Sequence, residues 1–145
     1  NWQSSEAFQL VLKASARHRV KFFAYATLPE LVEMYQGARM FIYPSLYEGF
    51  GIPVLEAFSA GCPLLASNLT SIPEVAGDAA LYFDPLCEKD MANVILSLVD
   101  DEKLQQSQRE KGQRRATQFS WRETARKTLS IYQEISKEEE RKVAQ

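Results

Sequence analysis

Residues 48–56 read Glu-Gly-Phe-Gly-Ile-Pro-Val-Leu-Glu and follow an apolar run, Met40–Tyr43, that ends in a proline and a serine. Gly49 and Gly51 have no side chains, so the backbone there can take positive φ and approach a ligand closely. Pro53 suits the first position of a helix, where an amide would have no partner within the helix. The stretch therefore predicts a strand, a loop and a helix start, which together form the repeating unit of α/β folds.

Strand and helix patterns alternate on both sides of this stretch. Short apolar runs predict strands at Val20–Tyr25, Met40–Tyr43, Pro63–Ala66 and Ala80–Phe83. Apolar spacing and capping patterns predict helices at residues 4–16, 27–37, 53–60 and from 71, and then at 88–99, 101–118 and from 120. This order predicts a Rossmann-like parallel sheet with helices on both faces and a helical C-terminus. Aromatic side chains are predicted in its core at Phe41, Tyr43, Phe58, Phe83 and Trp121.

Composition and charge limit the classes of function. The 145 residues carry 17 basic and 19 acidic side chains, and a net charge of -2 gives no general case for binding nucleic acid. The sequence shows neither an apolar run of membrane-spanning length nor a secretion signal, so a cytoplasmic protein is expected. Cys62 and Cys87 are not at metal-binding spacing and are predicted to be reduced structural thiols.

Glu48 and Glu56 are the candidate binding residues of the central stretch. Ionised carboxylates accept hydrogen bonds from neighbouring hydroxyls, such as those of a ribose or a hexose. The helix start at Pro53 offers amides and the positive end of its dipole to a phosphate. A nucleotide sugar carries both kinds of group. The pattern alone is equally consistent with a glycine turn, a proline helix start and a Glu56 that complements the helix dipole.

The sequence from Tyr43 to Ala57, followed by Gly61-Cys62-Pro63, resembles the signature of the group 1 glycosyltransferases, also called glycosyltransferase family 4. The resemblance runs from about Trp2 to Ile135 and includes Ser67-Asn68, Pro73–Ala80, Asp84-Pro85, Gly112 and Phe119-Ser120-Trp121. It implies a retaining enzyme of the GT-B fold, which holds a nucleoside diphosphate sugar mainly in the second of two Rossmann-like domains. Residues 1–145 are then expected to be this C-terminal domain, without its first strands and without the N-terminal acceptor domain.

The resemblance also implies a role for each site residue. Glu48 corresponds to the carboxylate that binds the hydroxyls of the donor sugar and is the expected catalytic residue. Glu56 corresponds to the carboxylate that binds the ribose. Backbone amides of Gly49, Phe50 and Gly51 are expected to contact the sugar. Those of Val54 and Leu55 are expected to contact the diphosphate, and the loop at Tyr25 is expected to lie against the base. No cofactor and no divalent metal are expected.

The expected partners are the nucleotide sugar and a saccharide or lipid-linked acceptor. The Arg and Lys with which the family neutralises the leaving diphosphate have no match here, so the chain by itself is expected to be inactive. An open sheet edge beside Val20–Tyr25 predicts self-association. The basic cluster between Lys111 and Lys127 is predicted to be a solvated helical face, with peripheral contact to acidic lipids as the alternative.

Two rival functions stay open beside the transferase. One is a catalytically silent binding or interaction module that keeps the sugar-nucleotide pocket. The other is a GT-B epimerase of sugar nucleotides, although such epimerases do not usually carry this signature. Donor base, donor sugar, acceptor and linkage are left undecided by these residues.

Overall fold

In the computed structural model residues 10, 13 and 17–143 are described, and the chain divides into two compact units after Leu31. The first unit contains a short 3-10 helix, η2 (Arg17–Arg19), and the start of α2 (Leu28–Gly37). The Thr27 amide donates to Glu30 Oε2 at 2.8 Å, as the capping pattern predicts. The helix predicted at residues 4–16 lies outside the described residues except at positions 10 and 13, which are helical.

The strand predicted at Val20–Tyr25 does not form. Phe23 and Tyr25 are 62% and 82% exposed, in irregular backbone. A strand is stable only where a second strand completes its backbone hydrogen bonds, and the described part of residues 1–31 contains none. β propensity depends on such surroundings, which explains the wrong prediction. The sheet edge on which the predicted self-association rested is therefore not formed by this segment.

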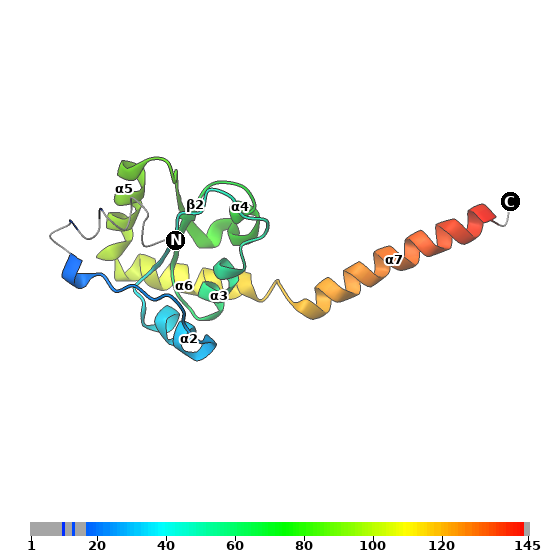
Figure 1. The fold of residues 1–145 in the computed structure, drawn as a ribbon, viewed down its shortest axis with the longest axis horizontal. Coiled ribbons are helices and arrows are strands. Elements are labelled where there is room, and N and C mark those ends of the chain that lie inside the picture. The colour runs from blue at the N-terminus through cyan, green and yellow to red at the C-terminus, as the bar shows by residue number, and fades with distance from the viewer. Residues whose placement is uncertain (1–9, 11–12, 14–16, 144–145) are drawn as a thin grey trace. The chain divides into compact units, whose positions relative to one another are not determined.

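The second unit is built on a three-stranded parallel sheet whose strands are connected by helices (Figure 1). Its order is β1 (Phe41–Tyr43), β2 (Leu64–Ser67) and β3 (Ala80–Phe83). Phe41 lies beside Leu64, and Leu64 beside Ala80, so the three strands start in register. The sheet confirms the predicted parallel, Rossmann-like arrangement, with β2 as its buried centre.

The alternation of side chains along the strands divides the core into two clusters. Leu64 and Ala66 of β2 face one cluster and Leu65 faces the other. The first cluster is formed with α3 (Ile52–Ser59), α4 (Ile72–Ala76) and η3 (Gly77–Ala79), through Val54, Phe58, Ile72, Val75, Ala76 and Ala79. The second is formed with α5 (Glu88–Val99), through Met91, Val94, Ile95 and Leu98. Helices thus cover both faces of the sheet, as predicted.

Helix α6 (Glu102–Ala116) lies along α3, and Gly112 allows the two helices to approach closely. A Cβ atom on Gly112 would lie 2.6 Å from Cδ1 of the buried Phe58 ring. The end of α3 follows the prediction: Gly61 has a φ of +74°, and the Cys62 amide donates to the Ala57 carbonyl at 2.8 Å. Only glycine takes this φ without strain.

The basic cluster of α6 and α7 is only partly a solvated face. The guanidinium of Arg115 donates to the carbonyls of Glu74 and Val75 at 2.6 and 2.9 Å. It also lies over the ring of Phe119, 5.1 Å from the ring centroid. Arg115 therefore connects the end of α6 to α4. Its charge is engaged by groups of the second unit rather than by solvent.

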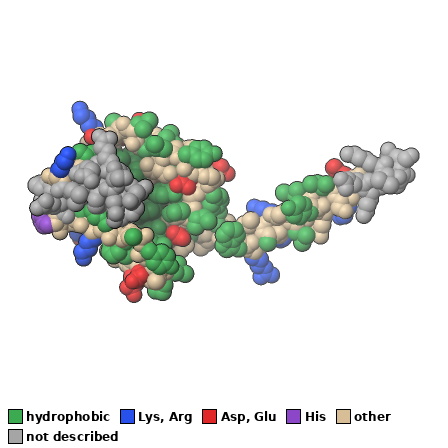
Figure 2. All heavy atoms as spheres, viewed as in Figure 1, with side chains coloured by type: hydrophobic (Ala, Val, Ile, Leu, Met, Phe, Trp, Pro, Cys, Tyr) green, Lys and Arg blue, Asp and Glu red, His purple; other side chains and the backbone are tan. Residues whose placement is uncertain are grey.

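Helix α7 (Trp121–Val143) exposes the apolar side chains that its sequence pattern places in a stripe. Trp121 is 80% exposed, so its prediction as a core residue is wrong; Phe119, two residues earlier, packs on the core instead. Figure 2 shows hydrophobic and basic side chains along this helix. Cys62 is buried as predicted, whereas Cys87 is exposed. None of the helices in the described part of the chain combines the length and the apolar character that a membrane span requires.

Candidate functional site

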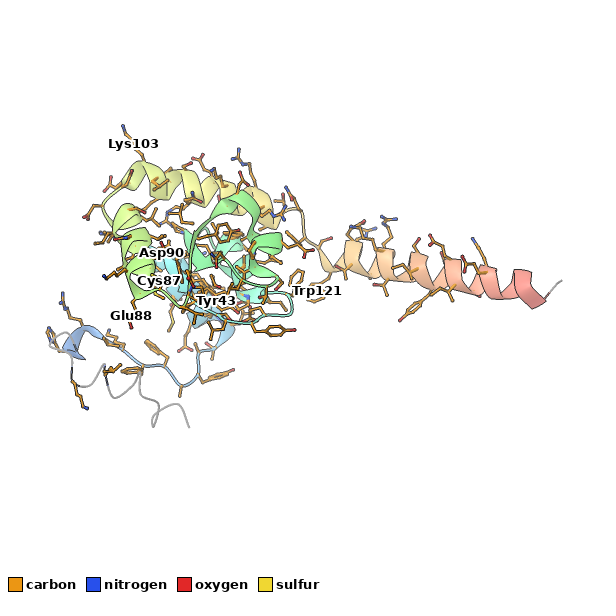
Figure 3. All side chains as sticks on the ribbon, turned by 90° about the horizontal axis from the view of Figure 1, so that it is seen from above. Tyr43, Cys87, Glu88, Asp90, Lys103 and Trp121 are labelled. Carbon is orange, nitrogen blue, oxygen red and sulfur yellow. The ribbon has the colours of Figure 1, made fainter. Side chains whose placement is uncertain are left out.

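The candidate site lies at the carboxyl ends of β1 and β2. Parallel strands end at the same edge of a sheet, and open α/β sheets bind ligands at that edge. Tyr43 is the last residue of β1, and Figure 3 shows it among the packed side chains of the sheet region. The loop at residues 44–51 follows β1, and the loop at residues 68–71 follows β2. Hydrogen bonds between these two loops bring them together at Glu48.

The side chain of Glu48 is held through one carboxylate oxygen. Oε1 accepts hydrogen bonds from the Tyr43 hydroxyl and from Ser45 Oγ, the latter at 2.8 Å. These two bonds, that of Tyr43 first, hold the pKa of Glu48 below its ordinary value. Among the described residues no hydrogen bond reaches Oε2. The site therefore presents an ionised carboxylate with one oxygen available to a ligand.

The backbone of Glu48 is also held, by the loop that follows β2. The Glu48 amide donates to Thr70 Oγ1 at 3.2 Å, and Ser71 Oγ donates to the Glu48 carbonyl at 2.9 Å. The sequence pattern predicts Ser71 as a side-chain cap of the next helix, and this is wrong. Ser71 is the N-cap residue of α4 but makes no side-chain cap bond, and its hydroxyl donates to the Glu48 carbonyl instead.

Glu56 lies on α3 and accepts a long hydrogen bond from the Tyr35 hydroxyl, at 3.4 Å. Burial, followed by the charge of Glu56, raises the pKa of Tyr35 to about 12. Tyr35 and Tyr43 both contact Phe41, with ring centroids 5.1 and 5.6 Å apart. Three aromatic rings in contact, Tyr35 of α2 and Phe41 and Tyr43 of β1, thus reach from Glu56 at one end to Glu48 at the other.

The two predicted carboxylates both affect the pKa of Tyr43. Burial is the main cause that raises the pKa of Tyr43, and the hydrogen bond to Glu48 comes next. The charges of both Glu48 and Glu56 add to this rise in the pKa, so both carboxylates act on one hydroxyl.

The glycine loop leads directly into α3. Gly51 has a φ of +98°, as expected of a position that needs glycine, whereas Gly49 is exposed and not in the left-handed region. The Phe50 ring meets the Phe119 ring edge-to-face at 6.0 Å. Helix α3 begins at Ile52, one residue earlier than predicted, and the Val54 amide donates to the Gly51 carbonyl at 3.0 Å. This amide was predicted to be free and is not.

The other predicted site residues are less informative. The Leu55 side chain is partly buried and packs on the first core cluster. Tyr25 belongs to the first unit and is 82% exposed, at the end of the segment predicted as a strand. The described residues contain no group of three His, Cys, Asp or Glu side chains that could hold a metal ion.

Four residues of the site were not predicted from the sequence to have a functional role. Tyr35, Ser45, Thr70 and Ser71 each bond to one of the two glutamates. Tyr43 was predicted only as a core residue, and in the structure its hydroxyl also donates to the Glu48 carboxylate. Tyr35 and Thr70 are 21 and 22 residues from their partners, so no local spacing points to them.

Removing the Tyr43 hydroxyl tests the origin of the pKa shift. In Tyr43→Phe we expect the pKa of Glu48 to rise towards its ordinary value of 4.5, because the largest cause of the lowering is lost. A lowered folded-state pKa stabilises the fold above the ordinary value, and this stabilisation disappears as the pH falls through the folded pKa. The loss of stability in Tyr43→Phe should therefore be present at neutral pH and shrink on acidification.

NMR titration of 13C-labelled glutamate carboxyls in the intact protein measures this shift. Tyr82→Phe is the matched control, since the Tyr82 hydroxyl donates to the Gly77 carbonyl at 2.6 Å and touches no carboxylate. The same Glu48 titration in wild type and Tyr43→Phe would contradict the assignment.

Comparison with known proteins shows which family the chain resembles. The profile described as "Glycosyl transferases group 1" matches residues 3–115. The chain is 37% identical over 131 residues to O-antigen chain mannosyltransferase B of Escherichia coli. The aligned region covers 90% of this chain and 34% of that protein. It is 33% identical over 108 residues to the MMP alpha-(1->4)-mannosyltransferase of Mycolicibacterium hassiacum, over 72% of this chain and 26% of that protein. The chain thus spans about a third or less of these curated relatives.

A solved structure shows the same fold. The sucrose-phosphate synthase of Thermosynechococcus elongatus superimposes on 89% of this chain with a TM-score of 0.80 and 24% sequence identity. The chain corresponds to 33% of that protein. At this identity the likeness concerns the arrangement of the sheet and helices.

Proposed function

The chain belongs to the group 1 glycosyl transferases, and from this premise we propose that it holds the nucleoside diphosphate sugar donor of a glycosyltransferase. The proposed reaction is the transfer of a hexosyl group, with retention of configuration, to a saccharide or lipid-linked acceptor. Since the chain spans 34% of its relative from Escherichia coli, this activity is proposed for the intact protein that contains the chain.

One observation supports the proposal most strongly: Glu48 is fixed at the sheet edge with one carboxylate oxygen occupied and one available. An ionised carboxylate accepts hydrogen bonds and donates none, so it suits the hydroxyls of a sugar. The lowered pKa of Glu48 keeps it in this form. The start of α3 follows within four residues, and a helix N-terminus suits the diphosphate.

In the proposed complex the site residues of the second unit bind different parts of the donor. Glu48 accepts hydrogen bonds from the donor hexose, and Glu56 accepts them from the ribose. The positive end of the α3 dipole stabilises the charge that grows on the diphosphate as the glycosidic bond breaks. The sugar is contacted by amides of the glycine loop and the diphosphate by the Leu55 amide, since the Val54 amide already donates to the Gly51 carbonyl. No metal or other cofactor takes part in this scheme.

The names of the relatives narrow the proposed donor. Both relatives quoted above are named mannosyltransferases, and one is named for the O-antigen chain. We therefore propose mannose as the transferred hexose and polysaccharide synthesis as the setting. The proposed location is the cytoplasm, where nucleotide sugars are the available donors, with peripheral contact to the membrane if the acceptor is lipid-linked.

A ligand screen on the intact protein tests donor binding. We expect GDP-mannose, rather than UDP-glucose or ADP-glucose, to raise the unfolding midpoint, because a ligand that binds only the native state stabilises it. At a ligand concentration of 100 times Kd, the gain is about 2.7 kcal/mol. The shift should be unchanged in EDTA, since no divalent metal is proposed. Differential scanning fluorimetry provides the readout.

One further readout separates the proposal from its rival. Release of nucleoside diphosphate in the presence of an acceptor distinguishes a transferase from a silent module that only binds the donor. Glu123→Gln should leave ligand binding and nucleotide release unchanged, because the Glu123 side chain pairs with Arg126 on the exposed face of α7. If none of the nucleotide sugars changes the midpoint, donor binding is refuted.

A further inference from the structure

Thr70 has an unusual backbone conformation for its residue type. Its φ is +53°, and it is the only non-glycine position with positive φ in the described part of the chain. A β-branched side chain in the left-handed region is strained, and such strain persists only where the surrounding structure requires it. The loop after β2 could have used glycine here, so the threonine side chain itself needs an explanation.

The conformation places two adjacent hydroxyls on the backbone of one residue of the other loop, Glu48. Thr70 Oγ1 accepts from the Glu48 amide, and Ser71 Oγ donates to the Glu48 carbonyl. The two bonds have opposite polarity: one hydroxyl accepts from the amide of Glu48 and the other donates to its carbonyl, and a hydroxyl group can do either. The helix that follows gains nothing from this arrangement, because α4 makes no side-chain cap bond with Ser71.

The bonds to Glu48 leave it little freedom. Its amide and carbonyl are held from the loop after β2, and Oε1 is held by Tyr43 and Ser45 from the end of β1. Four groups from two strand ends thus fix both the backbone and the carboxylate. A carboxylate that meets a ligand through its remaining oxygen depends on such support for its direction.

We propose that Thr70 and Ser71 are positioning residues that hold the Glu48 carboxylate in the orientation that binds the donor sugar. The inference rests on the proposed function of Glu48 as the ligand of that sugar. Neither hydroxyl contacts the donor in this scheme. The strain at Thr70 is retained because it delivers Oγ1 to the Glu48 amide.

The test compares four substitutions in the intact protein by steady-state kinetics of sugar transfer. Thr70→Val keeps the shape and removes the acceptor, and we expect kcat/KM for the donor to fall about tenfold. Ser71→Ala should act in the same direction. Thr70→Ser should recover most of the activity. Thr128→Val is the control, because the Thr128 hydroxyl bonds only to the Thr124 carbonyl within α7.

Thr70→Gly separates positioning from simple structural support. Glycine relieves the strained φ but lacks the hydroxyl, so we expect the activity of Thr70→Val with a thermal midpoint no lower than that of wild type. A structural role alone predicts the opposite, namely that activity follows the midpoint and stays near wild type in Thr70→Gly. That result would overturn the inference.

A double-mutant cycle shows whether the effect passes through Glu48. In the Glu48→Gln background, Thr70→Val should cause little further loss, because the carboxylate that it positions is already gone. An undiminished tenfold loss in that background would overturn the inference. If Glu48→Gln lowers activity and Thr70→Val does not, the inference fails and the proposed function stands. If Glu48→Gln has no effect, the proposed function itself fails.

Discussion

Replacing Glu48 by glutamine should lower kcat/KM for sugar transfer by roughly 100-fold in the intact protein, the order of magnitude typical of losing one aligned electrostatic contact in an active site. The glutamine can still accept hydrogen bonds from Tyr43 and Ser45 through its own Oε1. The amide NH2 group of the glutamine replaces the second carboxylate oxygen, and this group donates hydrogen bonds but cannot accept one from a sugar hydroxyl. The loss is measured by steady-state assays with the donor that stabilises the protein.

The fold should not change in Glu48→Gln, because the backbone of this residue is held by Thr70 and Ser71. Thermal unfolding without ligand checks this. Glu123→Gln is again the matched control and should keep wild-type activity. Full transfer activity in Glu48→Gln, or an equal loss in the control, would refute the role assigned to this carboxylate.

Gly112→Ala should lower the free energy of unfolding by about 1–3 kcal/mol, the usual cost of an added methyl group in a closely packed core. The new Cβ would lie 2.6 Å from Cδ1 of Phe58, and the ring is fully buried and cannot move aside freely. Alanine favours a helix over glycine by up to about 1 kcal/mol, which reduces the effect but does not cancel it. Denaturant unfolding of the intact protein measures the change.

Gly37→Ala is the control for this substitution. Gly37 ends α2, and an added Cβ there would have no atom within 4 Å, so stability should not fall. A further check uses the contact itself: Phe58→Leu should cost less in the Gly112→Ala background than alone, because the two residues share one contact. Equal stability of Gly112→Ala and wild type would show that α3 and α6 can separate at little cost.

Most of the second unit could be predicted from local patterns. The positions of β1, β2 and β3 follow from short apolar runs, and α3 and α6 from helical spacing and caps. The prediction failed at Val20–Tyr25, where the same apolar pattern occurs without a neighbouring strand. It also failed at Trp121, because the core contact is made by Phe119. In both places the outcome depended on a partner, and a pattern within one segment contains no information about its partner.

The sequence alone determined the parallel sheet, the glycine loop and the two candidate carboxylates, because all of these depend on residues close together in the chain. The tertiary structure alone decided how the carboxylates are held. Tyr35 of α2 reaches Glu56 of α3 across 21 residues. Thr70 reaches Glu48 across 22 residues, since parallel strands bring their following loops to one edge. No regular spacing in the sequence predicts which side chains meet in this way. The strained φ of Thr70 likewise has no sequence signal, because it is maintained by contacts that form only when β1 and β2 pair.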